Sequence, residues 1–212
     1  MAGIGRVIGD AFQAVLKGAR RADEGLEGMP RNLGNHTRTI GRGVDDVDKF
    51  DNTVTTRGRN EKTTYFDPDT GRPSREQGTI LEDFGGSRRG DNATAVGNLG
   101  RSTDDGGHLG AHRFFGDTPD AGIAPQASNL NRGPWRSMEN EWANWVNKGY
   151  RVDYDIDVYP PGAVRPDSFE VSYTVSNPET GQVAYRNWPS FWNEAGESFD
   201  SVRPGDMPDL NR

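Results

Sequence analysis

The chain has 212 residues with a formal net charge of −7 at pH 7; 32% of its residues are hydrophobic, 28 are glycine and 13 are proline. Glycine has no three-residue period, which excludes a collagen, and it fills no core, which argues against one compact domain over the whole length. The lack of cysteine excludes a disulfide framework and a zinc–thiolate cluster, and the acidic balance argues against a partner held by bulk basicity.

The first expected element is an amphipathic helix within residues 1–28, where apolar residues recur at spacings of three and four. Its basic character leaves two interpretations: a helix that packs on a partner or on a missing upstream region, which we prefer, and a membrane-surface helix. Asp10 and Lys17 interrupt the apolar stretch, so we expect no signal peptide, and no run in the chain is long enough to span a membrane. Residues 29–60 are polar and predict a linker, with His36 as a solvated loop residue.

The middle of the chain predicts short strands and a long loop. Residues 62–66 and 79–84 are β-prone runs around the turn sequence of residues 67–73, which is typical of a hairpin. Residues 85–107 are rich in Gly, Asn, Asp and Arg and predict a long surface loop.

The second half predicts a helix followed by an antiparallel meander. Residues 133–149 carry one apolar stripe, for which core packing is preferred over base stacking: Trp135, Met138, Trp142, Trp145 and Val146. Residues 150–159 and 168–176 alternate between apolar and polar, and a turn at 177–181 leads into a third strand, so one sheet face is wet. The tail from about residue 194 is acidic and expected to be loosely held.

Two polar segments carry residue types suited to phosphodiester chemistry. His108 follows two glycines, and imidazole can take up a proton near neutral pH. Asn131 is expected just before a helix that begins near Gly133, where its amide oxygen either caps the helix or faces a hard cation. Glu139 lies eight residues further on and projects near the same side. With several arginines, these groups suit metal-assisted attack of water on a phosphodiester, although residue types alone leave other reactions open.

The sequences DGGH at 105–108, Pro125–Gln126 and LNRGPWRSME at 130–139 resemble motifs of the DNA/RNA non-specific endonucleases of the His-Me finger (ββα-metal) superfamily. The likeness is greatest to the branch found as C-terminal toxin domains of bacterial polymorphic toxins. The resemblance covers roughly residues 60–180, and two linked motifs in the right order make it fairly specific. It implies an α+β fold with a ββα-metal core and an antiparallel sheet, preceded by a helical or irregular N-terminal extension. We therefore expect an extension at 1–58, a nuclease domain at 59–193 and a loosely ordered tail at 194–212.

The resemblance also implies roles for individual residues. His108 would be the general base, and Asn131 the only direct protein ligand of one Mg²⁺ ion, with Mn²⁺ as an alternative. Glu139 would hold metal-bound water, and Asp105 would fix the geometry of the histidine turn. Asn129 is a weaker candidate for the metal ligand, because the eight-residue interval to Glu139 favours Asn131.

An arginine upstream of the histidine motif would stabilise charge on the phosphate. Arg88 or Arg89 is the leading match, with Arg101 and Arg75 behind them. Arg101, Arg132 and Arg136 are candidates for substrate binding, although solvated arginines at the start of the helix are an equal alternative for the last two. The better-known members carry Arg where Gly106 stands here, so one phosphate contact must come from elsewhere.

A second histidine, His112, lies four residues after His108 and raises the alternative of a zinc site. Zinc sites normally take three or four protein ligands, so a surface or supporting role is preferred for His112. Basic residues outnumber acidic ones in 86–113 and in 128–151, so the expected site can receive a polyanion despite the net charge.

The leading hypothesis is a Mg²⁺-dependent, sequence-non-specific endonuclease that cleaves DNA, with RNA as a second substrate. The resemblance implies a toxin domain of a larger bacterial effector, secreted or delivered into the cytoplasm of a target cell, with a cognate immunity protein and no integral membrane association. One alternative is a nuclease-like fold with weakened catalysis that serves as a binding module. Another is a nuclease selective for RNA or for a particular nucleic-acid structure.

Overall fold

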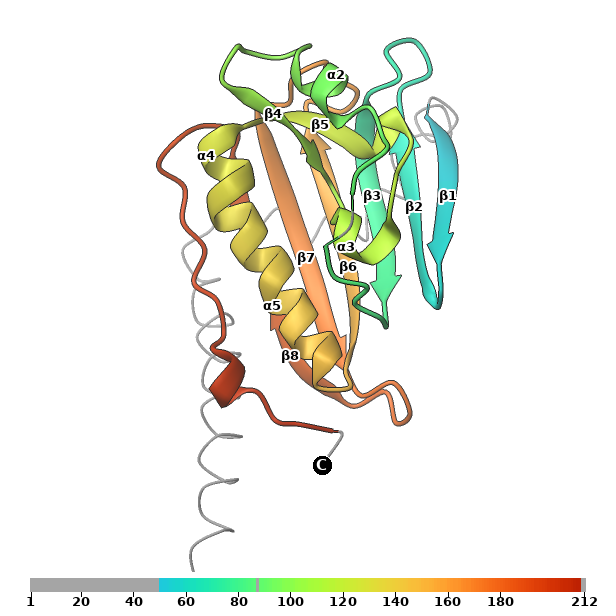
Figure 1. Cartoon of the computed structure of the whole chain (residues 1–212), viewed down its shortest axis with the longest axis vertical. Coiled ribbons are helices and arrows are strands. Elements are labelled where there is room, and N and C mark those ends of the chain that lie inside the picture. Colours follow the sequence, from blue (N-terminus) through green and yellow to red (C-terminus); the bar gives the residue numbers. More distant parts are fainter. Residues whose placement is uncertain (1–49, 87, 211–212) are drawn as a thin grey trace, which may run out of the picture.

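The computed structural model describes residues 50–86 and 88–210, so the helix expected within 1–28 and His36 lie outside the described residues. The described part consists of a seven-stranded sheet, a long helical segment across one face of it, and a two-stranded hairpin beside the start of that segment (Figure 1). Within these ranges no helix combines the length and apolar character needed to cross a membrane.

The large sheet is antiparallel throughout, with the order β1-β2-β3-β6-β7-β8, and β9 pairs with β7 beside β8. Its strands are β1 (Asp51–Arg57), β2 (Asn60–Phe66), β3 (Pro73–Ile80), β6 (Arg151–Tyr159), β7 (Ser168–Ser176), β8 (Val183–Asn187) and β9 (Ser190–Trp192). The predicted meander of the second half is confirmed as β6-β7-β8. A first meander, β1-β2-β3, joins it where β3 pairs with β6, and everything between β3 and β6 is an insertion that builds the polar side of the molecule.

The insertion contains a second, smaller sheet and most of the helices. The hairpin consists of β4 (Asp104–His108) and β5 (Ile123–Ala127), whose pairing sets His108 opposite Ile123. The helical segment that follows is α4 (Ser128–Leu130), the π-helical turn η5 (Asn131–Trp135) and α5 (Arg136–Asn147). The short elements are α2 (Ala93–Gly97), α3 (His112–Phe115), η4 (Asp120–Gly122) and, near the C-terminus, η6 (Pro204–Asp206).

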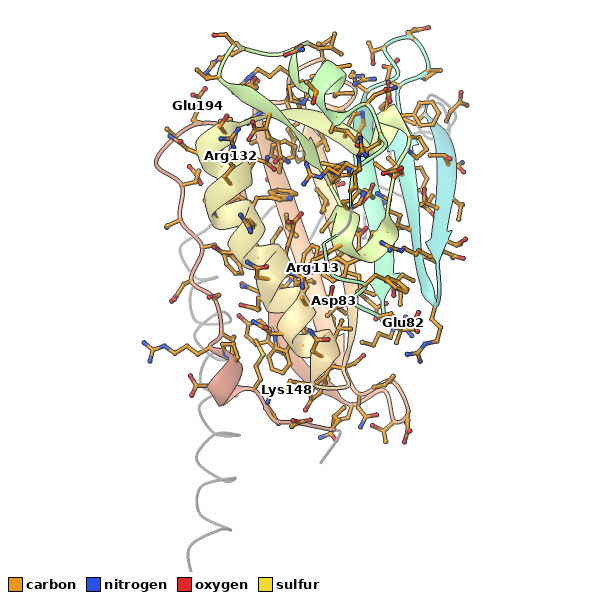
Figure 2. All side chains as sticks on the ribbon, in the orientation of Figure 1. Glu82, Asp83, Arg113, Arg132, Lys148 and Glu194 are labelled. Carbon is orange, nitrogen blue, oxygen red and sulfur yellow. The ribbon has the colours of Figure 1, made fainter. Side chains whose placement is uncertain are left out.

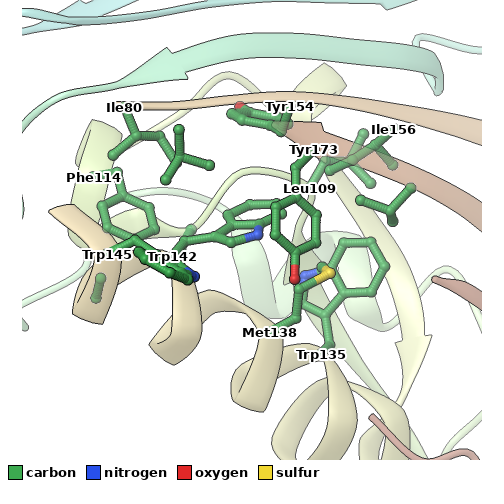
Figure 3. Packing of buried hydrophobic residues seen from close by; sticks show 14 of the residues in the cluster. Ile80, Leu109, Phe114, Trp135, Met138, Trp142, Trp145, Tyr154, Ile156 and Tyr173 are labelled. Atoms are coloured by element: carbon green, nitrogen blue, oxygen red, sulfur yellow. The ribbon is translucent and has the colours of Figure 1, made fainter. Parts of the chain in front are cut away.

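The aromatic stripe predicted on the helix forms the centre of the core. Trp135, Met138, Trp142 and Trp145 are fully buried, which confirms the packing interpretation (Figure 3). Trp142 stacks on Tyr154 of β6 with ring centroids 5.0 Å apart. Burial of such large side chains dominates the free energy of folding, so these contacts fasten α5 to the sheet.

The alternation predicted for β6 is confirmed: the residues facing α5 are buried, and those on the other face are partly exposed. Cross-strand pairs stabilise this outer face. Arg75 of β3 forms a bidentate ion pair with Asp155, and the hydroxyl of Thr79 donates to Asp153 Oδ1 over 2.6 Å.

Several predictions differ from the structure. The expected linker at 29–60 ends in β1, because its threonines and Val54 pair along β2, so the sheet begins before residue 59. The second arm of the first hairpin is β3, which starts directly after the turn, at Pro73, rather than at residue 79. The loop expected at 85–107 contains α2 and most of β4.

The segment after residue 194, expected to be loosely held, instead runs along α5 (Figure 1). The backbone N–H of Val202 donates to Glu141 Oε2 over 2.7 Å, and Met207 is buried. The N–H of Leu210 donates to the carbonyl of Lys148. The Val202 N–H gives the buried carboxylate of Glu141 a hydrogen-bond donor. Together the three contacts fix the path of the acidic segment along α5.

Candidate active site

An open cavity of about 680 Å³ lies between the hairpin, the start of the long helical segment and the stretch that leads into α2. Its walls include nine of the residues singled out in the sequence: Arg89, Asp105, Gly106, His108, His112, Asn131, Arg132, Arg136 and Glu139. Arg88 and Arg101 are not part of the walls. The tertiary structure thus brings the two sequence motifs onto one cavity.

The strand β4 delivers His108 to the cavity, and its two glycines allow the backbone to pass closely between neighbours. A Cβ at position 106 would lie 1.8 Å from the carbonyl oxygen of Ala93 in α2, and a Cβ at position 107 would lie 2.2 Å from Gln126 Oε1. Any side chain at position 106 would displace α2. Gly106, where the resemblance led us to expect an arginine, is therefore required by packing in this chain.

His108 is buried and paired with a carboxylate that the sequence did not single out. Its Nε2 lies 2.7 Å from Asp91 Oδ2, and both side chains are almost fully shielded from water. Burial lowers the pKa of His108 to about 4, the charges of Lys62 and Arg89 act in the same direction, and Asp91 opposes the shift. The imidazole is neutral at pH 7. Since the carboxylate accepts from Nε2–H, Nδ1 is the nitrogen left to take up a proton.

Asn131 is oriented by a salt bridge on β4. Its Nδ2 donates to Asp105 Oδ2 over 3.1 Å, while Arg132 donates to both oxygens of the same carboxylate at 2.7 and 2.6 Å. The amide oxygen of Asn131 is thereby turned away from Asp105. Asp105 therefore positions Asn131 and Arg132. The resemblance had implied that Asp105 fixes the geometry of a turn at His108, but residues 104–108 form strand β4.

The helix containing Asn131 begins earlier than predicted. The expected start was near Gly133, but α4 begins at Ser128, and Asn131 itself has helical backbone angles. Gly133, with φ −106° and ψ −106°, and Pro134 interrupt the regular helix within η5. Asn131 therefore lies inside a distorted turn and not at an N-cap.

Glu139 lines the cavity from α5, four residues after Trp135 and three before Trp142, so it lies next to these buried tryptophans on the helix surface. Burial raises the pKa of its carboxyl to about 8, while the charges of Arg89 and Arg113 oppose the shift. A divalent cation would oppose this shift and favour the ionised form of Glu139. With the amide oxygen of Asn131, the carboxylate would then supply hard oxygen donors on one cavity, a donor set that suits Mg²⁺.

The candidate arginines differ sharply in their surroundings. Arg89 lines the cavity, and its charge acts on both His108 and Glu139. Arg88 is exposed outside the cavity. Arg101 pairs with Glu194 at 2.8 Å, and Arg75 lies on the outer face of the large sheet. The geometry therefore favours Arg89 as the upstream arginine, together with Arg136, which also lines the cavity.

Two site residues were missed in the sequence. Asp91 had no recognisable spacing to His108, because the contact arises from the tertiary packing of α2 against β4. Arg113, on α3, lines the cavity and pairs with Asp83 at 2.6 Å (Figure 2). It also donates to Asn140 Oδ1 of α5 over 2.8 Å. Asn129, the alternative metal ligand, is exposed and lies outside the cavity walls.

Comparison with known proteins agrees with the motifs. A family model described as DNA/RNA non-specific endonuclease matches residues 52–177, which is more than half of the chain. The fold is similar to the crystal structure of NucA from Streptococcus agalactiae with magnesium ion bound, at 12% identity and a TM-score of 0.47, covering 80% of this chain and 92% of that one. The metal-free structure of the same nuclease gives 12% identity and a TM-score of 0.48, with 78% and 90% covered. By the family match, this chain belongs to the DNA/RNA non-specific endonucleases and is a nucleic-acid hydrolase.

Proposed function

We propose that the protein is a Mg²⁺-dependent endonuclease that cleaves DNA and RNA without sequence preference. The observation that carries this proposal is the convergence of a neutral His108, the Asn131 amide and Glu139 on one arginine-lined cavity. When bound, the ion would polarise a phosphate oxygen and stabilise charge on the leaving oxygen, and Mn²⁺ is an alternative ion for the same oxygen donors.

The His108–Asp91 pair would act as the general base that deprotonates the attacking water. Nδ1 of the neutral ring takes the proton of the attacking water, and the ring becomes cationic while Nε2–H stays on Asp91 Oδ2. The buried carboxylate then faces a positive charge and stabilises it. Burial keeps the ring unprotonated at neutral pH, so the base is ready before substrate binds.

The arginines hold the substrate. Arg89 and Arg136 would contact the scissile phosphate and its neighbours, while Arg132 is engaged with Asp105. Contacts to phosphate carry no sequence information, which supports non-specific cleavage. The overall charge of −7 limits long-range attraction of the polyanion, so binding would depend on these few arginines and the ion.

We extend the proposal to a toxin role in a bacterial effector that acts in the cytoplasm of a target cell and is neutralised by an immunity protein in the producer. The motif resemblance supports this role. The rival interpretation, a binding module with weakened catalysis, rested on Gly106 and on the acidic surface. The close approach of Ala93 is a sufficient reason for the glycine. Expression in bacterial cytoplasm should arrest growth and fragment the nucleic acid of the host; normal growth with soluble protein would contradict the toxin role.

The activity is tested with plasmid DNA and total RNA, each incubated in Mg²⁺, Mn²⁺ or EDTA. We expect cleavage of both substrates with either ion and none in EDTA. Asn131→Ala should require far more metal for the same rate, whereas the matched control Asn129→Ala, two residues away and exposed, should behave as wild type. Intact substrates under every condition would overturn the proposal, and an unchanged metal requirement in Asn131→Ala would move the ligand elsewhere.

A further inference from the structure

A second cluster of ligating groups lies beside His108, and one of its members, His112, also lines the active-site cavity. One ligand atom each of Asp91, His112 and Asp117 lies within 4.8 Å of the other two. His112 Nε2 is 3.0 Å from Asp117 Oδ1, which also accepts from the backbone N–H of Gly90 over 2.8 Å. Asp91 lies two residues before α2, His112 is the first residue of α3, and Asp117 is the second residue after α3 ends.

The hydrogen bonding of one buried carboxylate oxygen in this cluster is incomplete. The Asp91 side chain is 2% exposed, and its Oδ1 is buried without a well-formed hydrogen bond. An unsatisfied buried acceptor is costly, and a cation is one partner that would satisfy it. Asp117 is 55% exposed, so an ion can reach the cluster from solvent.

We propose that Asp91, His112 and Asp117 bind a zinc-like transition-metal ion whose presence inhibits the nuclease. One imidazole nitrogen and two carboxylate oxygens are a ligand set that Zn²⁺ accepts with water in the fourth position. Mg²⁺ prefers oxygen donors alone, so the histidine separates this cluster from the oxygen donors of Asn131 and Glu139.

Inhibition follows from the double role of Asp91. The same carboxylate accepts from His108 Nε2 at 2.7 Å, and the rings of His108 and His112 are 5.6 Å apart. An ion held by Asp91 competes with the Nε2–H of His108 for this carboxylate, so it weakens the contact that orients the imidazole in the cavity. Only this inhibition rests on the proposed function; binding of the ion does not depend on it.

Binding is measured by calorimetric titration of Zn²⁺ into the full chain in millimolar Mg²⁺, and repeated in an Asn131→Ala background that removes the oxygen site. We expect a tight site in both, weakened at least ~10-fold by Asp117→Asn. The matched control Asp120→Asn, whose carboxylate accepts from Asn92 Nδ2 over 3.1 Å, should bind as wild type. No tight binding by wild type, or equal binding by Asp117→Asn, would overturn the site.

Inhibition is measured by adding Zn²⁺ to a digest of plasmid DNA in Mg²⁺. Wild type should lose activity over the range in which the site fills, and Asp117→Asn should need at least ~10-fold more Zn²⁺ for the same loss. Equal inhibition of both proteins would refute the coupling. A chain that binds Zn²⁺ at this cluster but cleaves nothing would instead refute the proposed function.

Discussion

In each of two regions of the molecule, a basic side chain is buried against a carboxylate. The two pairs differ in how many hydrogen bonds the rest of the protein donates to the carboxylate. Between β2 and β3, Lys62 Nζ lies 3.1 Å from Glu76 Oε2, and both side chains are fully buried. Thr64 donates to the same oxygen over 2.6 Å, and Tyr154 donates to Oε1 over 2.9 Å. In the hairpin region, His108 and Asp91 are as close, yet His108 borders an open cavity and Asp91 Oδ1 lacks a well-formed partner.

The difference separates a structural pair from a functional one. Each oxygen of Glu76 has a protein donor, so the pair is closed and can only stabilise the sheet. In the His108–Asp91 pair, Nδ1 of the ring and Oδ1 of the carboxylate do not take part in the contact between the two residues, so they can interact with a proton or a ligand. Proton transfer or ligand binding is expected at a buried ionisable pair that lies beside a cavity and still has atoms able to form hydrogen bonds.

The largest effect is expected for His108→Ala. Loss of a general base should lower kcat by ~10²–10⁴-fold, because the neutral imidazole of His108 is the group proposed to take the proton from water. Initial rates on plasmid DNA in saturating Mg²⁺ measure this, with circular dichroism to verify the fold. Cleavage at the wild-type rate would show that His108 is not the general base.

Glu76→Gln tests the closed pair. The buried Lys62 would lose its counter-charge, so the free energy of unfolding should fall by about 3–5 kcal/mol, measured by urea denaturation. Glu61→Gln on the same β2 hairpin, where the side chain is exposed, should change it by less than about 0.5 kcal/mol. Equal losses in the two variants would mean that the buried pair contributes nothing specific.

Asp91→Asn tests the open pair. Removing a hydrogen bond to a charged partner should cost about 1.5–3 kcal/mol of transition-state stabilisation, or ~10–100-fold in kcat. Asp91 raises the pKa of His108, which burial holds at about 4, so its loss should lower that pKa further. The acid limb of kcat/KM, where activity falls as the ring takes up a proton, should therefore move to lower pH. An unmoved limb would assign Asp91 a structural role only.

The smallest effect separates two adjacent arginines. Arg89→Ala should lower kcat/KM by about tenfold, as expected for one charge-assisted contact to phosphate. Arg88→Ala, outside the cavity, should stay within about twofold of wild type. A larger loss of kcat/KM in Arg88→Ala than in Arg89→Ala would mean that Arg88, and not Arg89, contacts the phosphate.

The sequence periodicity predicted the helices and strands whose buried face is set by their own apolar residues. The tryptophan stripe of α5 and the alternation of β6 and β7 follow from side-chain periodicity, and the structure confirms both. β1 escaped prediction because its polar, threonine-containing sequence forms a strand only when paired with β2. The helix start at Ser128 escaped prediction because Gly133 and Pro134, which normally mark a boundary, lie inside a distorted turn that continues the helix.

The candidate site divides in the same way. The sequence by itself determined the chemical types and their order, because His108, Asn131 and Glu139 lie in motifs whose spacing is set by one strand and one helix. Only the tertiary structure decided that Asp91 holds His108, that Asp105 orients Asn131, and that Arg89 rather than Arg88 faces the cavity. Those contacts join segments that share no period, and they exist because the insertion between β3 and β6 folds α2 onto β4. Periodicity determines which face of an element is buried, whereas packing between elements determines which polar groups meet.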